Sequence, residues 1–119
     1  HCEYKIIEGY QTSSNIAALR VSSDIFINAQ VTDAFSASVQ EYLYAGNLLI
    51  NPKWLIYHEL DAWGIYYRTY DVFEDLASII SNTIHDGLPD LKDNAKLLIE
   101  KTSWQAVRQS WLDIMMNNP

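Results

Sequence analysis

Two short apolar runs, Ile25–Ile27 and Leu48–Ile50, constrain the fold of this chain more than any other feature. Each run is continuous and bounded by polar residues, which is typical of a strand buried on both faces of a parallel sheet. Residues 28–47 separate the runs, and a connection between parallel strands ordinarily contains a helix. The pattern therefore predicts an α/β fold with right-handed crossovers between parallel strands.

The connection itself has the signals of a helix. Ser36 is a good N-cap, Val39, Tyr42 and Leu43 follow at helical spacing, and Gly46 ends the segment after Ala45. Residues 31–35 then form a loop between the first run and this helix, which places the loop at the carboxyl edge of the sheet. Open α/β sheets bind their ligands at that edge.

The flanking segments extend the pattern in both directions. We expect a strand at 4–7, a short helix capped within Thr12–Asn15 that turns Ile16, Leu19 and Val21 inward, a helical turn within 54–63 that ends at Gly64, and a strand at 65–67. Beyond Asp71, which can cap a helix, the inward positions are Phe73, Leu76, Ile80 and Ile84. A last helical region at 90–116 breaks near Thr102–Ser103, and its inward positions are Leu97, Leu98, Trp104, Val107, Trp111 and either Ile114 or Met115. The fold class is thus a doubly wound, Rossmann-like parallel sheet with helices on both faces and helices at the C-terminus.

Length and charge narrow the function classes. The 119 residues correspond to one domain. The net charge of −7 and the absence of a run of basic residues argue against binding to nucleic acid or to an anionic membrane surface. No apolar run approaches the roughly 20 residues of a transmembrane helix. A single cysteine, Cys2, excludes an internal disulfide and is compatible with a cytoplasmic protein. The first residue, His1, is not methionine, which favours a truncated domain over residues 1–119.

Two acids and the small residues between them suggest a ligand site. Asp33 precedes the helix, and Glu41 lies eight residues later, about a turn and a half inside it. The free amides of a helix N-terminus suit a phosphate, and a carboxylate can accept hydrogen bonds from two vicinal hydroxyls. Alternatively, Asp33 and Ser36 only cap the helix and Glu41 is a solvated surface acid.

The same stretch resembles the C-terminal, donor-binding domain of GT-B glycosyltransferases, in the large retaining family that includes sucrose and glycogen synthases. Asp33-Ala34-Phe35-Ser36 and Glu41 resemble the family's Glu-Gly-Phe-Gly segment and its second glutamate, and Ser23–Ile27 resembles its Ala-Asp-Val-Phe-Val strand. Glu59 stands where the family has the acid of its Pro-Glu turn. Ser103-Trp104 resembles the start of the family's closing helix. The resemblance runs from about Tyr4 to Met115.

The resemblance implies a role for each matching residue. Glu41 would hold the ribose hydroxyls of a UDP- or GDP-sugar, and Asp33 would be the catalytic-site acid that faces the donor sugar. The backbone at Phe35, Ser36, Ala37 and Ser38 would contact the sugar and the distal phosphate. Asp33 is one methylene shorter than the family's glutamate, and Ala34 and Ser36 replace two glycines. Those replacements shorten the reach of the acid and narrow the room for a ligand.

The resemblance also implies missing parts. The family's basic pair lies upstream of the matching segment, and so do the first strands and the acceptor domain that would hold a glycan. This chain alone should therefore not transfer a hexosyl group, and no further cofactor is expected. The family's sheet has the strand order 3-2-1-4-5-6. The strand at 25–27 corresponds to strand 4, and its neighbour, strand 1, is among the missing parts. We expect its open edge to be covered by self-association, as a homo-oligomer, or by a rearranged first segment.

Several other residues admit two interpretations. The aromatic cluster Trp54, Tyr57, Trp63, Tyr66, Tyr67 and Tyr70 is either core and interface or a platform for sugar stacking. Lys53 is either solvated or close to a donor phosphate. His58 and His85 have no partner at a metal-like spacing, so no metal site is expected. The alternative function for the whole chain is a non-catalytic interaction module that binds itself or a protein partner through its aromatic face.

Overall fold

The structure is a computed structural model that describes residues 3–117. Within these residues lies a three-stranded parallel sheet in the order β1-β2-β3. Its strands are β1 (Ile25–Ile27), β2 (Leu48–Pro52) and β3 (Arg68–Tyr70). Ile25 lies opposite Leu48, and Ile50 lies opposite Arg68. The predicted α/β class and the parallel pairing of the two apolar runs are confirmed.

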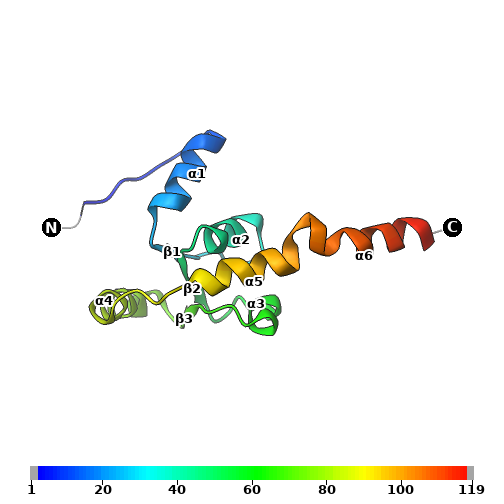
Figure 1. Cartoon of the computed structure of the whole chain (residues 1–119). Coiled ribbons are helices and arrows are strands. Elements are labelled where there is room, and N and C mark those ends of the chain that lie inside the picture. The colour runs from blue at the N-terminus through cyan, green and yellow to red at the C-terminus, as the bar shows by residue number, and fades with distance from the viewer. Residues whose placement is uncertain (1–2, 118–119) are drawn as a thin grey trace.

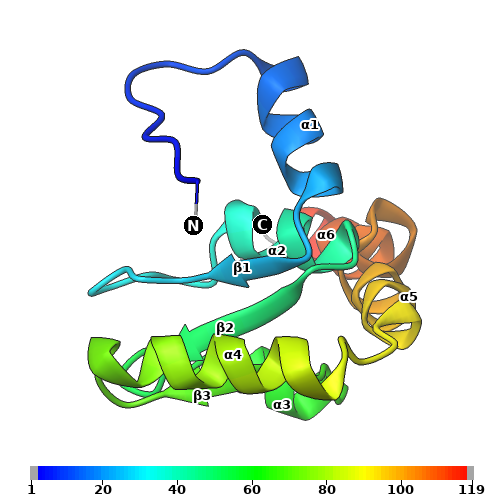
Figure 2. The same ribbon diagram turned by 90° about the vertical axis from the view of Figure 1, so that its left-hand side faces the viewer.

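Helices lie on both faces of the sheet, as predicted. In Figures 1 and 2, α4 lies on one face, α2, α3 and α5 lie on the other, and α1 and α6 extend away from it. The bounds are α1 (Ser13–Ser22), α2 (Ala37–Tyr44), α3 (His58–Trp63), a 3-10 turn η1 (Phe73–Asp75), α4 (Leu76–Asp86), α5 (Lys92–Thr102) and α6 (Trp104–Asn117).

Several residues predicted to begin or end the helices do so in the structure. The hydroxyl of Thr12 accepts from the Asn15 amide at 3.2 Å, and the hydroxyl of Ser36 accepts from the Val39 amide at 3.4 Å. Gly46 follows α2 with a φ of +88°, a conformation that glycine adopts at little cost. The break between α5 and α6 falls at Ser103, where the chain becomes extended.

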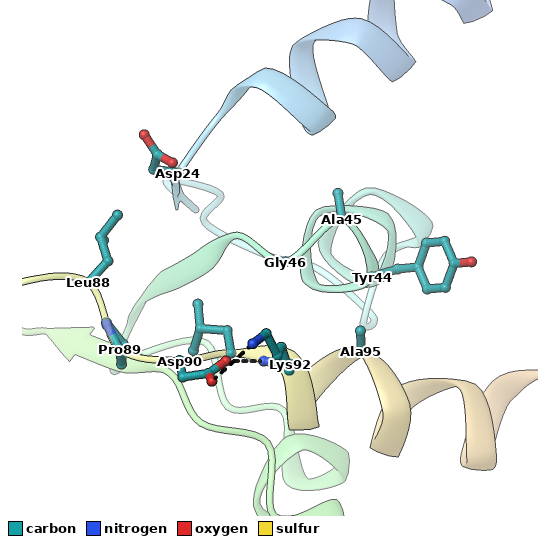
Figure 3. Close-up of a pocket in the computed structure, with 10 residues that line it drawn as sticks. Asp24, Tyr44, Ala45, Gly46, Leu88, Pro89, Asp90, Lys92 and Ala95 are labelled. Carbon is teal, nitrogen blue, oxygen red and sulfur yellow. Dashed lines mark hydrogen bonds and ion pairs between the residues drawn. The ribbon is translucent and has the colours of Figure 1, made fainter.

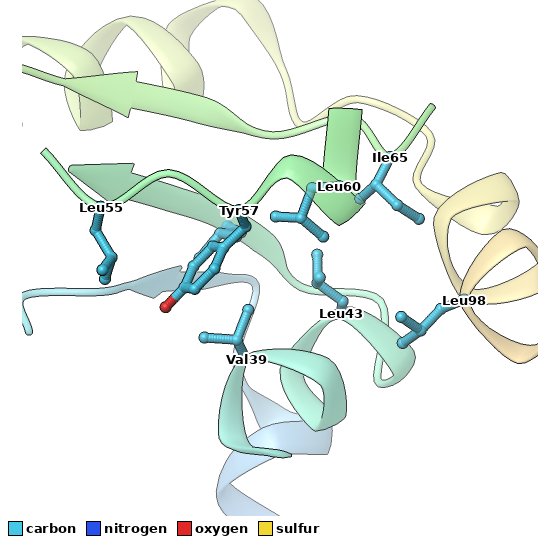
Figure 4. Close-up of a cluster of buried hydrophobic side chains, with 8 residues drawn as sticks. Val39, Leu43, Leu55, Tyr57, Leu60, Ile65 and Leu98 are labelled. Carbon is cyan, nitrogen blue, oxygen red and sulfur yellow. The ribbon is translucent and has the colours of Figure 1, made fainter. Parts of the chain in front are cut away.

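The hydrophobic core lies between β2 and the helices α2, α3 and α5 (Figure 4). Every residue of β2 is buried, because both of its edges are paired and both of its faces are covered. Leu43 and Leu60 from two different helices are fully buried against this strand. The cluster consists of Val39, Leu43, Leu49, Leu55, Tyr57, Leu60, Ile65 and Leu98.

Two strand predictions were wrong. Residues 4–7 have no regular structure and are exposed, because no strand within the described chain lies beside them to pair with their backbone. The third strand is Arg68–Tyr70 instead of residues 65–67. The backbone of Ile65 is bonded to Leu60 at the end of α3, and that of Tyr66 exchanges two hydrogen bonds with the Asn94 side chain. Pairing can therefore begin only after them.

The first strand also differs from the prediction. β1 is half-buried instead of buried on both faces, and within residues 3–117 it pairs with β2 alone. The first segment does not cover the outer edge, because residues 3–12 add no strand to the sheet and α1 packs beside α2. The predicted inner face of α1 is not buried either: Val21 is exposed, and α1 has no buried residue. Covering of the open edge by self-association remains a prediction.

The inward positions predicted for the C-terminal half were partly wrong. Phe73 and Ile84 are exposed, and Asp71 forms an ion pair with Lys53 instead of capping a helix. Leu98 is buried as predicted. The apolar side chains of α6 are largely exposed, because α6 leaves the body of the molecule after Ser103; these are Trp104, Trp111, Ile114 and Met115, whereas Val107 is half-buried.

Candidate functional site

A buried polar network lies at the carboxyl edge of the sheet. Asn28 follows β1 directly, and its amide nitrogen donates to the Oδ1 of Asn51 and to the hydroxyl of Tyr57, both at 3.0 Å. Asn51 in turn donates to the carbonyls of Pro52 and Leu55. All three side chains are about 2% exposed. Because each amide hydrogen of the two asparagines has an acceptor, the network is satisfied and holds the ends of β1 and β2 in one arrangement.

Asp33 is the outer member of this network. Its Oδ2 accepts from the Tyr57 hydroxyl at 2.5 Å and from the Ser36 amide at 3.1 Å, and its Oδ1 accepts from the Ala34 amide at 2.9 Å. The acid is half-buried. It therefore organises the loop before α2 through three hydrogen bonds. The helix itself is capped by Ser36, so the capping interpretation holds for Ser36 and not for Asp33.

These contacts favour the charged form of Asp33. Partial burial raises the pKa of its carboxyl, but the hydrogen bonds from Tyr57, Ser36 and Ala34 together lower the pKa below the ordinary value. Burial raises the pKa of Tyr57, and the hydrogen bond to the negative Asp33 raises it further. At neutral pH the pair is thus an Asp33 carboxylate that accepts a hydrogen bond from the protonated hydroxyl of Tyr57.

The loop at 31–35 places the N-terminus of α2 at the carboxyl edge of the sheet. Phe35 has a φ of +52°, which is uncommon for a residue with a side chain and is held here by its ring contacts with Tyr57 and Trp63. Ala37 and Ser38 follow in the first turn of α2 and are exposed. Amides in a first turn have no acceptor within the helix. The predicted positions 35–38 therefore meet at one exposed end of α2.

Glu41 lies further along α2 and faces α1. Its Oε2 forms an ion pair with the guanidinium of Arg20 at 2.5 Å. Arg20 also lies over the ring of Tyr42, and its side chain is mostly buried. About half of the Glu41 side chain remains exposed. Asp33 thus lies in the loop before α2 and Glu41 lies inside the helix, as predicted. Each acid has its own set of partners, and Arg20 was not foreseen as a partner of Glu41.

The aromatic cluster divides between core and surface. Tyr57 and Tyr70 are buried, and the Tyr70 hydroxyl donates to the carbonyl of Asn28 at 2.8 Å. Trp54 is partly exposed, with its indole nitrogen donating to the carbonyl of Gln30. The Nζ of Lys53 forms an ion pair with the Oδ2 of Asp71 at 2.6 Å, so the charge of Lys53 already has a partner. The cluster therefore does not form one continuous aromatic face.

A separate cavity of about 430 Å³ lies at the opposite, amino edge of the sheet (Figure 3). It is bordered by the segment before β1, the end of α2 and the start of α5. Asp24, Gly46 and Leu88 are among its lining residues, and Asp90 there bonds with Lys92. None of the predicted site residues lines this cavity.

The sequence held a signal for the network that was overlooked. An asparagine stands at the end of each of the two apolar runs, Asn28 after the first and Asn51 after the second. Parallel strands end at the same edge, so two such side chains meet there. The partner of Glu41 had no such signal, because the separation of Arg20 from Glu41 in the chain shows no regular pattern.

Neither a metal centre nor a membrane span is found in the described part of the chain. Residues 3–117 contain no group of three or more His, Cys, Asp or Glu that could hold a metal ion. The same residues contain no helix with the length and apolar character needed to cross a bilayer. Comparisons with protein-family models, curated proteins and solved structures found no match.

Proposed function

We propose that this chain binds a sugar nucleotide, as the donor-binding part of a glycosyltransferase that transfers a hexosyl group to a glycan or another acceptor. The proposal treats the chain as part of a GT-B C-terminal domain that does not catalyse transfer alone. The observation that carries it is the loop from Asn28 to Ser36. A buried network holds this loop at the carboxyl edge of a parallel sheet, where it leads into an exposed helix N-terminus.

The distal phosphate of the donor would bind at the start of α2. Ala37 and Ser38 are exposed residues whose amides lack helical acceptors, and the positive end of the helix dipole favours an anion there. Phe35 sets the direction of the loop through its positive φ. The net charge of −7 opposes an anionic ligand. Binding by this chain alone should therefore be weak, with a Kd on the order of 1 mM.

Glu41 would bind the ribose hydroxyls while it remains paired with Arg20. The ion pair uses Oε2, and half of the side chain is exposed, so the second oxygen can accept from a vicinal diol. Arg20 then has a positioning role, because it holds the carboxylate in one orientation. The mostly buried guanidinium in turn depends on this carboxylate for its charge partner.

Asp33 would stand nearest the donor sugar. A carboxylate can accept about four hydrogen bonds, and Asp33 already accepts from Tyr57, Ser36 and Ala34. About one position remains for a sugar hydroxyl. Its main contribution is then to hold the backbone of the loop in place.

Calorimetric titration with a UDP-hexose and a GDP-hexose tests the proposal. We expect one of the two to bind, and Glu41→Gln to weaken that binding about tenfold or more by removing a charged acceptor. Glu100→Gln is the matched control, because it also removes one negative charge but lies exposed on α5. The absence of binding to both donors, or equal effects of the two substitutions, would contradict the proposal.

One observation favours the second candidate, a non-catalytic interaction module. The acid that should receive the ribose is already paired with Arg20, and Lys53 is paired with Asp71, so both charges are partly neutralised within the chain. The two candidates separate in the same titration. A module that binds only proteins gives no heat with either sugar nucleotide at millimolar concentration.

A further inference from the structure

Helix α6 presents an apolar surface that its own chain leaves open. Trp104 is 62% exposed, Trp111 54%, Ile114 59% and Met115 71%. Among residues 3–117 the helix has substantial contacts only with α5, and Figure 1 shows it extending beyond the body of the molecule toward the C-terminus. These side chains were predicted to face inward, but they do not contribute to the hydrophobic core.

The apolar side chains follow the spacing of a helix that pairs with another helix. Trp104, Val107, Trp111 and Ile114 alternate at intervals of three and four residues, which places them along one stripe. This is the a and d pattern of a coiled coil over two heptads. Leu112, Met115 and Met116 are also exposed beside the stripe. Within one copy α5 contacts only the beginning of α6, since the two helices run one after the other.

We propose that two copies of this chain associate by pairing their α6 helices antiparallel, with the stripe Trp104, Val107, Trp111 and Ile114 of each copy against that of the other. The centre of the pairing is Gln109. Trp104 then lies level with Ile114 of the second copy, and Val107 level with its Trp111. Each large indole meets a smaller β-branched side chain, which fills the space between two helices better than indole against indole.

Charge selects the antiparallel arrangement. Within α6 the formal charges are those of Arg108 and Asp113, which cancel, so the net charge of −7 resides in the rest of the chain. Parallel pairing would bring two acidic bodies to the same end of the helix pair. Antiparallel pairing places them at opposite ends of α6, about 20 Å apart along an axis that rises 1.5 Å per residue, where salt screens their repulsion.

The exposed area is sufficient for association. The four side chains and their apolar neighbours expose on the order of 600 Å² per copy. A pair then buries about 1,200 Å², the lower end of the range for specific interfaces. Area alone does not set the affinity. For an interface at the lower end of this range we expect a Kd on the order of 10 μM, so the dimer should form and dissociate across concentrations accessible to ultracentrifugation.

Sedimentation equilibrium of the whole chain tests the proposal. We expect a monomer–dimer equilibrium in which Trp111→Ser raises the Kd about 30-fold or more, as at an interface hot spot. Leu112→Ser is the matched control: Leu112 lies on the same helix and is also exposed, but it is off the stripe. We expect it to change the Kd less than about threefold. A monomer at every concentration, or equal effects of the two substitutions, overturns the proposal and leaves the stripe to a different partner.

The orientation has its own measurement. A spin label at Asn117→Cys, in a Cys2→Ser background, reports the distance between the two helix ends. Pairing centred on Gln109 places Asn117 level with residue 101 of the other copy, so the labels should lie about 24 Å apart at 1.5 Å per residue. A distance of about 10 Å, the separation of two helix axes, would show parallel pairing and refute the antiparallel arrangement.

Discussion

The body of the molecule and helix α6 contain the same kind of side chains in opposite surroundings. In the body, Leu43 and Leu60 are fully buried between the sheet and three helices. In α6, Trp104 and Trp111 stand in the same periodic pattern and are more than half exposed. The difference shows that helical spacing identifies an apolar face but does not identify what covers it.

The two regions should also respond differently to substitution. The body combines a hydrophobic cluster with a satisfied polar network, so the loss of one member affects its neighbours. The apolar side chains of α6 have few neighbours within the chain, and their loss should change association instead of folding. The predictions below begin in the body, where the effects are largest.

Leu43→Ala should give the largest loss of stability. Leu43 is completely buried at the centre of the cluster in Figure 4, and truncation leaves a cavity next to β2. We expect the free energy of unfolding to fall by about 2–5 kcal/mol. Urea denaturation measures this change. A loss below about 1 kcal/mol would mean that the site between α2, α3 and β2 is not tightly packed.

Tyr57→Phe should have the next largest effect. It removes the hydroxyl that donates to Asp33 and accepts from Asn28, and it leaves a buried amide hydrogen without an acceptor. The expected loss is about 1–3 kcal/mol, again by urea denaturation. Tyr67→Phe is the control, because the hydroxyl of Tyr67 bonds to Asp61 in a more exposed position. If the control loses as much stability, the network has no special role.

Alkaline pH should destabilise the body. Burial, and then the hydrogen bond to Asp61, raise the pKa of Tyr67 to about 12, and burial and Asp33 raise that of Tyr57 as well. An unfolded tyrosine loses its proton near pH 10. Above about pH 10 the unfolded chain therefore binds fewer protons than the folded chain, and stability falls as the pH rises toward the folded pKa values.

Urea midpoints on both sides of pH 10 measure this decline. Each of the variants Tyr57→Phe and Tyr67→Phe removes one titrating group, so the decline should be shallower in both. An unchanged decline in both variants would assign it to other groups.

Ile114→Ala should have the smallest effect on folding. Ile114 is 59% exposed on α6, so its truncation removes few contacts within one copy. The free energy of unfolding should change by less than about 0.5 kcal/mol when measured below the concentration of dimer formation. A loss comparable to that of Leu43→Ala would show that α6 packs against the body in solution.

Local signals predicted much of the body. The apolar runs identified β1 and β2, and Thr12, Ser36 and Gly46 located three helix ends correctly. Such features depend on residues close in sequence, so a single chain carries them. The carboxyl edge was predicted for the same reason, because it follows from the order of strands and helices.

Features that depend on distant partners were not predicted. The third strand begins at Arg68 instead of Ile65 because the side chain of Asn94, 28 residues away, forms hydrogen bonds with the backbone N–H and C=O of Tyr66. Arg20 reaches Glu41 from another helix, and Tyr57 joins Asp33 across the end of the sheet. In each case the deciding contact is tertiary, and neither spacing nor propensity encodes it.

Titration calorimetry of this chain with UDP- and GDP-hexoses most directly tests the central claim, that the loop before α2 and Glu41 form a sugar-nucleotide site. The account predicts weak binding of one donor, with a Kd on the order of 1 mM, that Glu41→Gln reduces and Glu100→Gln leaves unchanged. No heat with either donor at concentrations well above that Kd would contradict it. The Asn28–Asn51–Tyr57–Asp33 network would then serve only to stabilise the edge of the sheet.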